Sequence, residues 1–571
     1  MIMKICPECG RGYDDTMAFC LDDGAELLYG PASIDEPATA ILHITDAARD
    51  APTRAQIHTT EQTVILPSGI SDVGKRGFDK RLLAAGFLVV IISLGMYLGY
   101  RFLGSNTQQI ESIAVMPFVN ESGNADVEYL SDGMTETLIK SLSQLPNLAV
   151  KSRSTVFYYK GKETSPRKIG EELGVQAVLL GRVGGRGDDL KLNLELVNTH
   201  TQNVIWSEQY DRKQSDLIRL QSEIAKDVSA KLKSKLSGAD EAKVTKTSTA
   251  NPEAYQLYLK GRFQWNKRTG ESLRQAVEYF NQAIEKDPNY ALAYSGLAES
   301  YTLFSNYSVA PPLEAMPKAK AAALRAIELD DSLAETHVAL GIYYSLFAWN
   351  QPIAEKEFKR AIELNPNYAT AHQQYGIECL TAMKRFDEAV AEAKRAEELD
   401  PLSPIIGADL GQILSRARQF DEAIAQLNKV IQLDQNFWVA YWYLGQVYHG
   451  KGQYAEAVAA YRKGLALSGD SPLIKALLIR SLTKTGERDE AVKLLGELQA
   501  ESKSRFISNS LLAIAYGGVG EKDKAFAYLE KDIAERGSRP PQIAVSPVWD
   551  DLRDDPRFAE MVRRVEAAKL D

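Results

Sequence analysis

The sequence predicts a multidomain protein. An all-α solenoid of about eight helix-turn-helix repeats fills the C-terminal half, behind a central α+β domain, one transmembrane helix and a small N-terminal metal-binding module. Three observations carry this prediction: small residues recur with a period near 34, an uncharged apolar run of nineteen residues interrupts the first hundred, and three of the four cysteines fall within the first twenty positions. At 571 residues, the chain is too long for one ordinary domain.

Small residues mark the repeats. Successive alanines are separated by steps of 35, 34, 34, 34 and 34 residues, and glycines follow nearly the same period. Two antiparallel helices in one repeat cannot bury their faces alone, so small residues are expected where helices cross and large ones between neighbours. The alanines are Ala354, Ala389, Ala423, Ala457, Ala491 and Ala525; the glycines are Gly261, Gly296, Gly341, Gly376, Gly411 and Gly445.

The repeat at 438–471 shows most of the pattern, with Gly445 and Tyr448 followed by Ala457 and Tyr461. Prolines in "LNPNY" and "LDPLS" are expected to end second helices. This spacing resembles that of the tetratricopeptide (TPR) family. We assign the repeat array to residues 252–540. The resemblance implies a protein that binds protein partners on a concave surface and is not an enzyme.

Polar and aromatic residues at inward positions are the candidate contacts of that surface: His372, Gln373, Tyr441 and Gln446. The periodic residues themselves are expected to be core, and Cys379 to be a buried structural thiol. Residues 541–571 are expected to form a capping helix, since "VWDDLRDDPRF" resembles an ending common after TPR arrays in bacterial signalling proteins. Its polar outer face would come from Asp550, Asp551, Arg553, Asp554 and Asp555.

The apolar run predicts a transmembrane helix at 82–103. Its nineteen uncharged residues would span roughly 28 Å, about the thickness of a hydrocarbon core. Four basic residues precede the run, and only Arg101 follows it before Lys140. The positive-inside rule therefore places the N-terminus in the cytoplasm and the C-terminal domains outside it, across the inner membrane. A cleaved signal peptide is the weaker alternative, because eighty residues come first.

The N-terminal cysteines predict a zinc site. Cys6 and Cys9 form one CxxC knuckle, and Cys20 with Asp23 forms a second at the same spacing. Three thiolates and a carboxylate suit a tetrahedral structural zinc, which a segment this short needs in order to fold. Residues 1–30 resemble small bacterial zinc-ribbon modules. Asp22 is an alternative fourth ligand, and a redox role is an alternative for the CxxC motif. Residues 31–80 are expected to form a disordered cytoplasmic linker.

Residues 108–236 predict an α+β domain. Strand-like runs at 112–118, 148–152, 177–183, 190–198 and 203–211 alternate with helical patterns at 128–145, 166–174 and 215–236. The stretches "IAVMPFVNESG" and "IGEELGVQAVLLGRV" resemble the amino-terminal domain of TolB. The resemblance implies an extracytoplasmic interaction domain without an active site. The glycines at 181–187 fit a hairpin turn, since no phosphate-loop motif is present.

Composition bounds the function. A net charge of -9 gives no reason to expect nucleic-acid binding, and the six histidines form no catalytic or metal motif. A membrane-anchored scaffold or sensor is therefore the favoured function, with no small-molecule substrate identified. The alternative is a regulator whose cytoplasmic zinc ribbon contacts DNA or the transcription or signalling machinery. Lys4 and Arg11 are the only basic residues in the first thirty, which makes phosphate binding poor.

Overall fold

The computed structural model describes residues 110–124, 127–145, 148–232, 237–305, 307, 309–537 and 542–570, and the backbone of 4–5, 12–13 and 28–29. The chain divides into two units, Met1–Gly104 and Ser105–Asp571. In the first unit, β1 (Lys4–Ile5) pairs antiparallel with both β2 (Gly12–Tyr13) and β3 (Leu28–Tyr29).

The predicted zinc ligands Cys6, Cys9, Cys20 and Asp23, the linker and the predicted transmembrane helix all lie outside the described residues. Within the described part of the chain, no helix is both long and apolar enough to cross a membrane. That same part holds no cluster of side chains suited to a metal ion.

The central domain contains the predicted sheet with helices packed on it. The strand order is β6-β4-β7-β8-β9, and β5 pairs with β7. β4 is parallel to β6 and β7, whereas β7, β8 and β9 form an antiparallel meander. The strands are β4 (Ser112–Val115), β5 (Val119–Asn120), β6 (Ala149–Val150), β7 (Ala177–Arg186), β8 (Asp189–Asn198) and β9 (Val204–Lys213). The helices are α2 (Glu128–Leu142), α3 (Arg153–Phe157), α4 (Pro166–Leu173), α5 (Leu217–Leu232) and α6 (Gly238–Val244).

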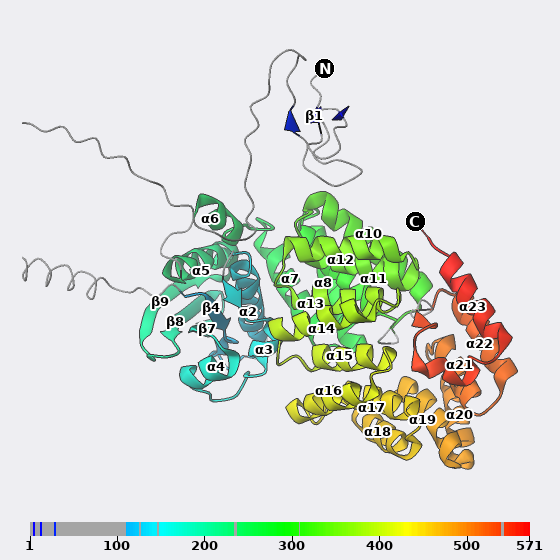
Figure 1. Ribbon diagram of the computed structural model, residues 1–571. Coiled ribbons are helices and arrows are strands. Elements are labelled where there is room, and N and C mark those ends of the chain that lie inside the picture. The colour runs from blue at the N-terminus through cyan, green and yellow to red at the C-terminus, as the bar shows by residue number, and fades with distance from the viewer. Residues whose placement is uncertain are drawn as a thin grey trace, which may run out of the picture. The chain divides into compact units, whose positions relative to one another are not determined.

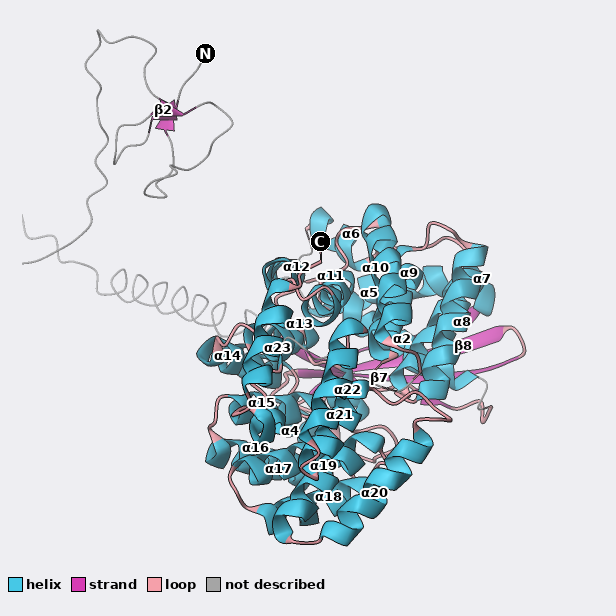
Figure 2. Ribbon diagram, turned by 90° about the vertical axis from the view of Figure 1, so that its right-hand side faces the viewer, coloured by secondary structure: helices cyan, strands magenta, loops and turns pink. Residues whose placement is uncertain are grey.

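The glycine-rich run forms the β7–β8 hairpin, as its sequence predicts. Gly185 and Gly187 adopt φ values of 146° and 64°, which favour glycine. A Cβ on Gly185 would lie 2.0 Å from the Asp189 carbonyl oxygen. Along β8, alternate leucines point into the core, as expected for a strand with one buried face. In Figure 2 the strands form the magenta layer, and α2 contacts β4 and β5 of this sheet.

Eight helix pairs follow along the chain, confirming the predicted array (Figure 1). The pairs are α7 (Pro252–Asn266) with α8 (Gly270–Lys286), α9 (Ala291–Leu303) with α10 (Pro312–Leu329), α11 (Ala334–Ile342) with α12 (Gln351–Leu364), α13 (Ala369–Gln374) with α14 (Phe386–Leu399), α15 (Pro404–Arg416) with α16 (Phe420–Leu433), α17 (Trp438–Gly450) with α18 (Tyr454–Leu467), α19 (Pro472–Thr485) with α20 (Arg488–Glu501), and α21 (Asn509–Gly518) with α22 (Lys522–Ala534). Helices α11 and α13 each continue into a π-helical turn, η3 (Tyr343–Phe347) and η4 (Tyr375–Leu380).

The periodic small residues are core, as predicted. The six periodic alanines have no exposed surface. Gly445 shows why glycine is required: a Cβ there would lie 2.5 Å from the Tyr461 ring, so the two helices of this pair could not approach as closely. Cys379 is also buried, and burial raises the pKa of its thiol to about 12. It is therefore the inert structural thiol that the sequence predicts.

The C-terminal end differs from the prediction of one capping helix. Residues Pro547–Leu552 form a 3₁₀ turn, η6, and the helix α23 spans Pro556–Ala567. Asp555 caps α23 by accepting a hydrogen bond from the Arg557 backbone N–H. Prolines at 547 and 556 explain the break, because each removes a backbone donor and begins a new helical segment.

Candidate binding groove

The first helices of the eight pairs form one continuous layer, since each contacts the first helix of the next pair. We call the side of this layer that faces away from the second helices the inner surface. It is the surface on which the sequence places protein contacts. Two other parts of the same chain cover it: the central domain over the early repeats and the residues before α23 over the later ones.

The helix α2 covers the inner surface of the first three repeats. Glu136 accepts hydrogen bonds from Arg262 of α7 at 2.8 Å and from Asn266 at 2.9 Å. Arg262 also donates to Glu299 of α9 at 3.0 Å, so one guanidinium links two carboxylates. Burial opposes the charge of Glu136, but Arg262 and Arg153 hold its pKa down at about 2.

Two further contacts extend this interface. Lys140, one turn beyond Glu136, pairs with Glu335 of α11 at 2.7 Å. Asp400, which follows α14, accepts hydrogen bonds from the hydroxyls of Ser154 and Thr155 in α3. Gly133 fits against Leu259, where a Cβ would come within 2.9 Å of a leucine methyl. The central domain is therefore seated on the array by contacts spaced along two of its helices.

Residues 542–555, which we call the tail segment, cover the inner surface of the later repeats. The side chain of Gln542 accepts a hydrogen bond from Arg416 of α15 at 2.8 Å and donates to Glu378 of η4 at 2.5 Å. The side chains of Gln542 and Arg416 are both buried. A buried amide that serves as donor and acceptor at once fixes the position of the segment.

Consecutive carboxylates of the tail segment bind cations of the array. Arg418 donates two hydrogen bonds to Asp550, at 2.7 and 2.8 Å, in a bidentate arrangement. Asp551 accepts a hydrogen bond from Arg480 of α19 and pairs with Lys484 at 3.0 Å. Burial opposes both charges, yet the neighbouring cations lower the pKa of each carboxyl.

Asp550 and Asp551 therefore do not supply the polar outer face that the sequence predicts for a cap. They point inward because the array presents cations there. Asp554 is exposed, as expected for an outer residue, and Arg553 turns back to donate to the Ala544 and Ser546 carbonyl oxygens.

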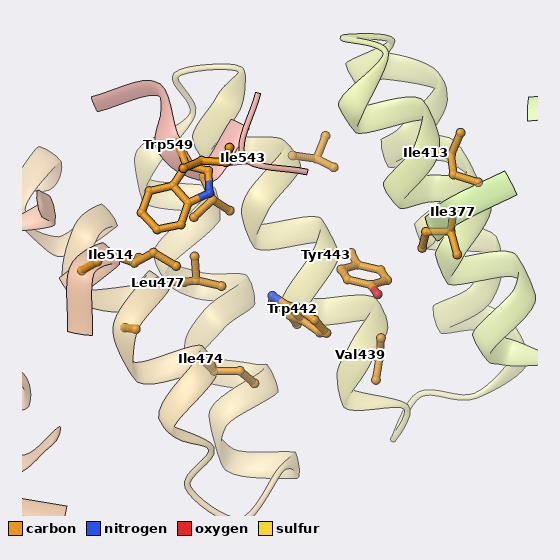
Figure 3. Packing of buried hydrophobic residues seen from close by; sticks show 14 of the residues in the cluster. Ile377, Ile413, Val439, Trp442, Tyr443, Ile474, Leu477, Ile514, Ile543 and Trp549 are labelled. Carbon is orange, nitrogen blue, oxygen red and sulfur yellow. The ribbon is translucent and has the colours of Figure 1, made fainter. Parts of the chain in front are cut away.

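Apolar side chains complete the contact. Figure 3 shows Trp549 and Ile543 of the tail segment beside Leu477 of α19 and Ile514 of α21. Leu552 is buried as well. Aromatic and aliphatic anchors of this kind dominate the binding energy of protein–peptide contacts.

A polar ladder lies deeper on the same surface. Gln373 donates to Asp409 at 2.7 Å, and the Tyr443 hydroxyl donates to the other oxygen of that carboxylate at 3.1 Å. Gln412 and Gln446 are hydrogen-bonded at 3.4 Å. Burial raises the pKa of Asp409 to about 6, and the hydrogen bonds only partly offset it.

Two of the four predicted contacts, Gln373 and Gln446, lie in this ladder. His372 does not, because its ring nitrogens bind Glu392 of α14 and the Pro366 carbonyl oxygen. The Tyr441 hydroxyl donates to the Gln435 carbonyl oxygen in the preceding loop. His372 therefore joins α13 to α14, whereas Tyr441 contacts the loop before its own helix.

The cations Arg416 and Arg480 were missed. Each directly follows a mostly apolar stretch of its helix, and that feature of the sequence could have revealed them.

Two family models match the chain. A tetratricopeptide-repeat family matches residues 406–542, and the second domain of HilA/YgeH-like transcriptional regulators matches residues 108–227. The helix pairs and the repeat match together show that the C-terminal half contains tetratricopeptide repeats. The predicted likeness of the central domain to TolB stays a prediction, because the matching model is a different one.

Two curated relatives share parts of the sequence. A protein named "Putative adenylate cyclase 3" from Rhizobium meliloti is 32% identical over 247 residues, covering 43% of this chain and 42% of that one. The transcriptional regulator HilA of Salmonella typhimurium is 32% identical over 90 residues, 16% of each chain. The chain thus spans less than half the length of these relatives. A solved structure of the Cut9–Hcn1 assembly is similar with a TM-score of 0.37, at 16% identity over 61% of this chain and 63% of that one.

Proposed function

We propose that this protein is a membrane-anchored scaffold or sensor whose TPR array binds protein partners outside the cytoplasm. The observation that supports it most is the continuous inner surface of eight helix pairs, on which Arg418 and Arg480 bind carboxylates. Proteins of the TPR class mediate protein–protein interactions. The sequence from 82 to 103 supports the anchor, and the basic residues before it support a cytoplasmic N-terminus.

The proposed cytoplasmic end carries a structural zinc held by Cys6, Cys9, Cys20 and Asp23. The purified chain should contain about one zinc per molecule, and Cys6→Ser should abolish it, as measured by elemental analysis. Asp22→Asn should leave the zinc content unchanged if Asp23 is the fourth ligand. Retention of zinc in the Cys6→Ser variant would contradict this assignment.

Crosslinking in intact cells tests the scaffold function. A photoreactive residue replaces Ile405, which is 40% exposed on α15, the first helix of its pair. The matched control replaces Val492, which is 52% exposed on α20, a second helix. Capture of a protein at 405 and not at 492 supports binding on the inner surface. Capture only at 492 moves the binding site to the other face, and capture at neither contradicts the scaffold.

The second candidate is a membrane-bound regulator whose cytoplasmic zinc ribbon contacts DNA or the transcription or signalling machinery. The match of residues 108–227 to a domain of transcriptional regulators favours it. Only two basic residues among the first thirty count against direct contact with phosphates. A mobility-shift signal from the detergent-solubilised full chain that Cys6→Ser abolishes would place this candidate first.

A further inference from the structure

The tail segment is bound to the array in the way a peptide is bound by a receptor. Its contacts come from a short run of consecutive residues, Trp549, Asp550 and Asp551, and from Gln542 a few positions earlier. They reach at least four successive repeats, through Glu378 of η4, Arg416 of α15 with Arg418 just after it, Gly450 of α17 beside Pro547, and Arg480 of α19. By contrast, the central domain is bound through a folded helical face.

We propose that the tail segment is an internal ligand of the inner surface, and that the partner is a protein segment of the same chemistry. This segment is turn-like, and its aromatic anchor and the two carboxylates that directly follow it lie in the 3₁₀ turn η6. The inference rests on the proposed function, that this array binds protein partners, and names the class of partner and the part of the surface that it occupies.

Arg480 sets the requirement for a carboxylate. Its side chain is 4% exposed, and it donates to both the Asp551 carboxylate and the Pro547 carbonyl oxygen, the latter at 3.1 Å. A buried guanidinium left without an anion is strongly unfavourable. A segment that replaces the tail must therefore bring an acidic side chain to Arg480 and an accessible backbone carbonyl beside it.

Arg418 and Lys484 extend this requirement to a second carboxylate. Arg418 donates two hydrogen bonds to Asp550. Lys484 pairs with Oδ1 of Asp551, the oxygen that does not accept from Arg480. Two adjacent carboxylates thus meet three cations from α19 and the end of α15. A neutral or basic segment would leave these cations unpaired, so the surface selects an acidic one.

Trp549 supplies the apolar part of the recognition. Its side chain is buried beside Leu477 and Ile514, from the first helices of the last two repeats (Figure 3). A large planar anchor in a pocket between repeats contributes affinity, while the neighbouring carboxylates set its orientation. The order of anchor and charges in the tail, Trp-Asp-Asp, is the order expected in the partner.

Covalent linkage makes the tail a strong competitor. A ligand on the same chain acts at an effective concentration on the order of millimolar. A partner segment of equal intrinsic affinity therefore binds only when the tail is released or weakened. The tail segment sets the threshold at which the later repeats become available, whereas the early repeats stay covered by the central domain.

Peptide binding to the purified full chain tests the inference. The probe is a fluorescent peptide with the sequence of residues 542–555, QIAVSPVWDDLRDD. Its affinity is measured by anisotropy for the wild-type chain, for D550N/D551N, and for the matched control Asp554→Asn, whose side chain is exposed beside the motif. The double variant should bind the peptide at least about tenfold more tightly than the other two, which is 1.4 kcal/mol.

The milder variant Asp550→Asn keeps the Asp551 contact to Arg480, and should show a several-fold gain even if the double variant does not fold. A peptide with both aspartates changed to asparagine should lose the binding. Equal affinity for all chains, or binding to none of them, would overturn the inference. If a partner is still captured at position 405 when the peptide binds no chain, the inference fails and the scaffold function stands.

Discussion

The early and late repeats present the same kind of surface and cover it in different ways. Over the early repeats, the folded helix α2 places Glu136 and Lys140 one turn apart against α7 and α11. Over the late repeats, a turn-rich tail segment places adjacent aspartates on Arg418 and Arg480. The first arrangement joins two parts of a compact unit, and the second has the form of a ligand that a competitor can replace.

This difference shows that an inner surface of uniform architecture need not have uniform function. The buried charge between α2 and the array is a network, with Arg262 shared by Glu136 and Glu299. At the tail, Asp551 is shared by Arg480 and Lys484, and Asp550 by Arg418 and Arg553, so each carboxylate keeps one cation when the other is removed. Removing one member of a buried network leaves the remaining charges without a partner. Mutations in the early repeats should therefore lower the stability more than mutations in the late repeats.

The largest effect is expected from Arg262→Ala. It removes the cation that the largely buried Glu136 and Glu299 share, and although Glu136 keeps Arg153, the loss should cost about 3–5 kcal/mol of unfolding free energy. Urea unfolding of the purified chain measures it. The control Arg274→Ala removes an exposed cation paired three residues away and should change the free energy by less than about 0.5 kcal/mol. Similar values for the two variants would contradict a buried charge network around Arg262.

A smaller loss is expected from Arg480→Ala. Lys484 still pairs with Asp551 in this variant, so the cost should be about 2 kcal/mol. The change should also increase the exposure of Trp549, visible as a red shift of tryptophan emission. Lys493→Ala, on the exposed face of α20, serves as the control and should alter neither property. A loss as large as that of Arg262→Ala would mean that the tail is as fixed as α2.

The contributions of Asp409 and Glu136 to stability should change in opposite directions as the pH falls. Asp409, with its pKa raised to about 6, favours the fold when protonated, so this contribution grows as pH falls from 7 to 5, by about 1 kcal/mol. Glu136, with its pKa held at about 2, stabilises above the unfolded pKa and loses that contribution only below about pH 4.

Urea unfolding at pH 7, 5 and 3 measures both contributions. Asp532, buried in α22 with a pKa also raised to about 6, adds to the gain between pH 7 and 5. The variant Asp409→Asn isolates its own share, which should disappear from the difference between pH 7 and pH 5. An unchanged difference in this variant would contradict the assignment.

The smallest effect is expected from Lys140→Ala. The pair with Glu335 is partly exposed, so its loss should cost no more than about 1 kcal/mol. High salt should reduce the cost further, which distinguishes it from the loss caused by Arg262→Ala. The exposed pair of Lys168 with Glu172 provides a comparison, for which Lys168→Ala should have no measurable effect. A cost above about 2 kcal/mol would mean that Lys140 belongs to the buried network.

The helix pairs were predictable because packing repeats. Residues such as Ala457 and Gly445 recur at one period, because the helices of every repeat must cross at the same close distance. Five strands of the central domain were also found, because their patterns are local, whereas the two-residue strand β5 was not. The helix α3 was missed: its five residues show no period, and its capping by Ser152 involves a single hydrogen bond.

The candidate groove was only partly predictable. Gln373 and Gln446 follow from their positions in the repeat, but Asp550 and Asp551 read as an outer polar face. Their true direction depends on Arg418 and Arg480, which are more than 70 residues away in one case and 132 in the other. A pattern in one sequence carries no information on such long-range pairing.

Hydrogen exchange on the wild-type full chain tests the central claim most directly. It compares amides of α2 with those of the tail segment, including Trp549, whose N–H donates to the Ser546 carbonyl oxygen. The account predicts that the tail amides exchange by local opening at a lower free energy, while the α2 amides exchange only with unfolding of the unit. Exchange of both sets at the same free energy would contradict it.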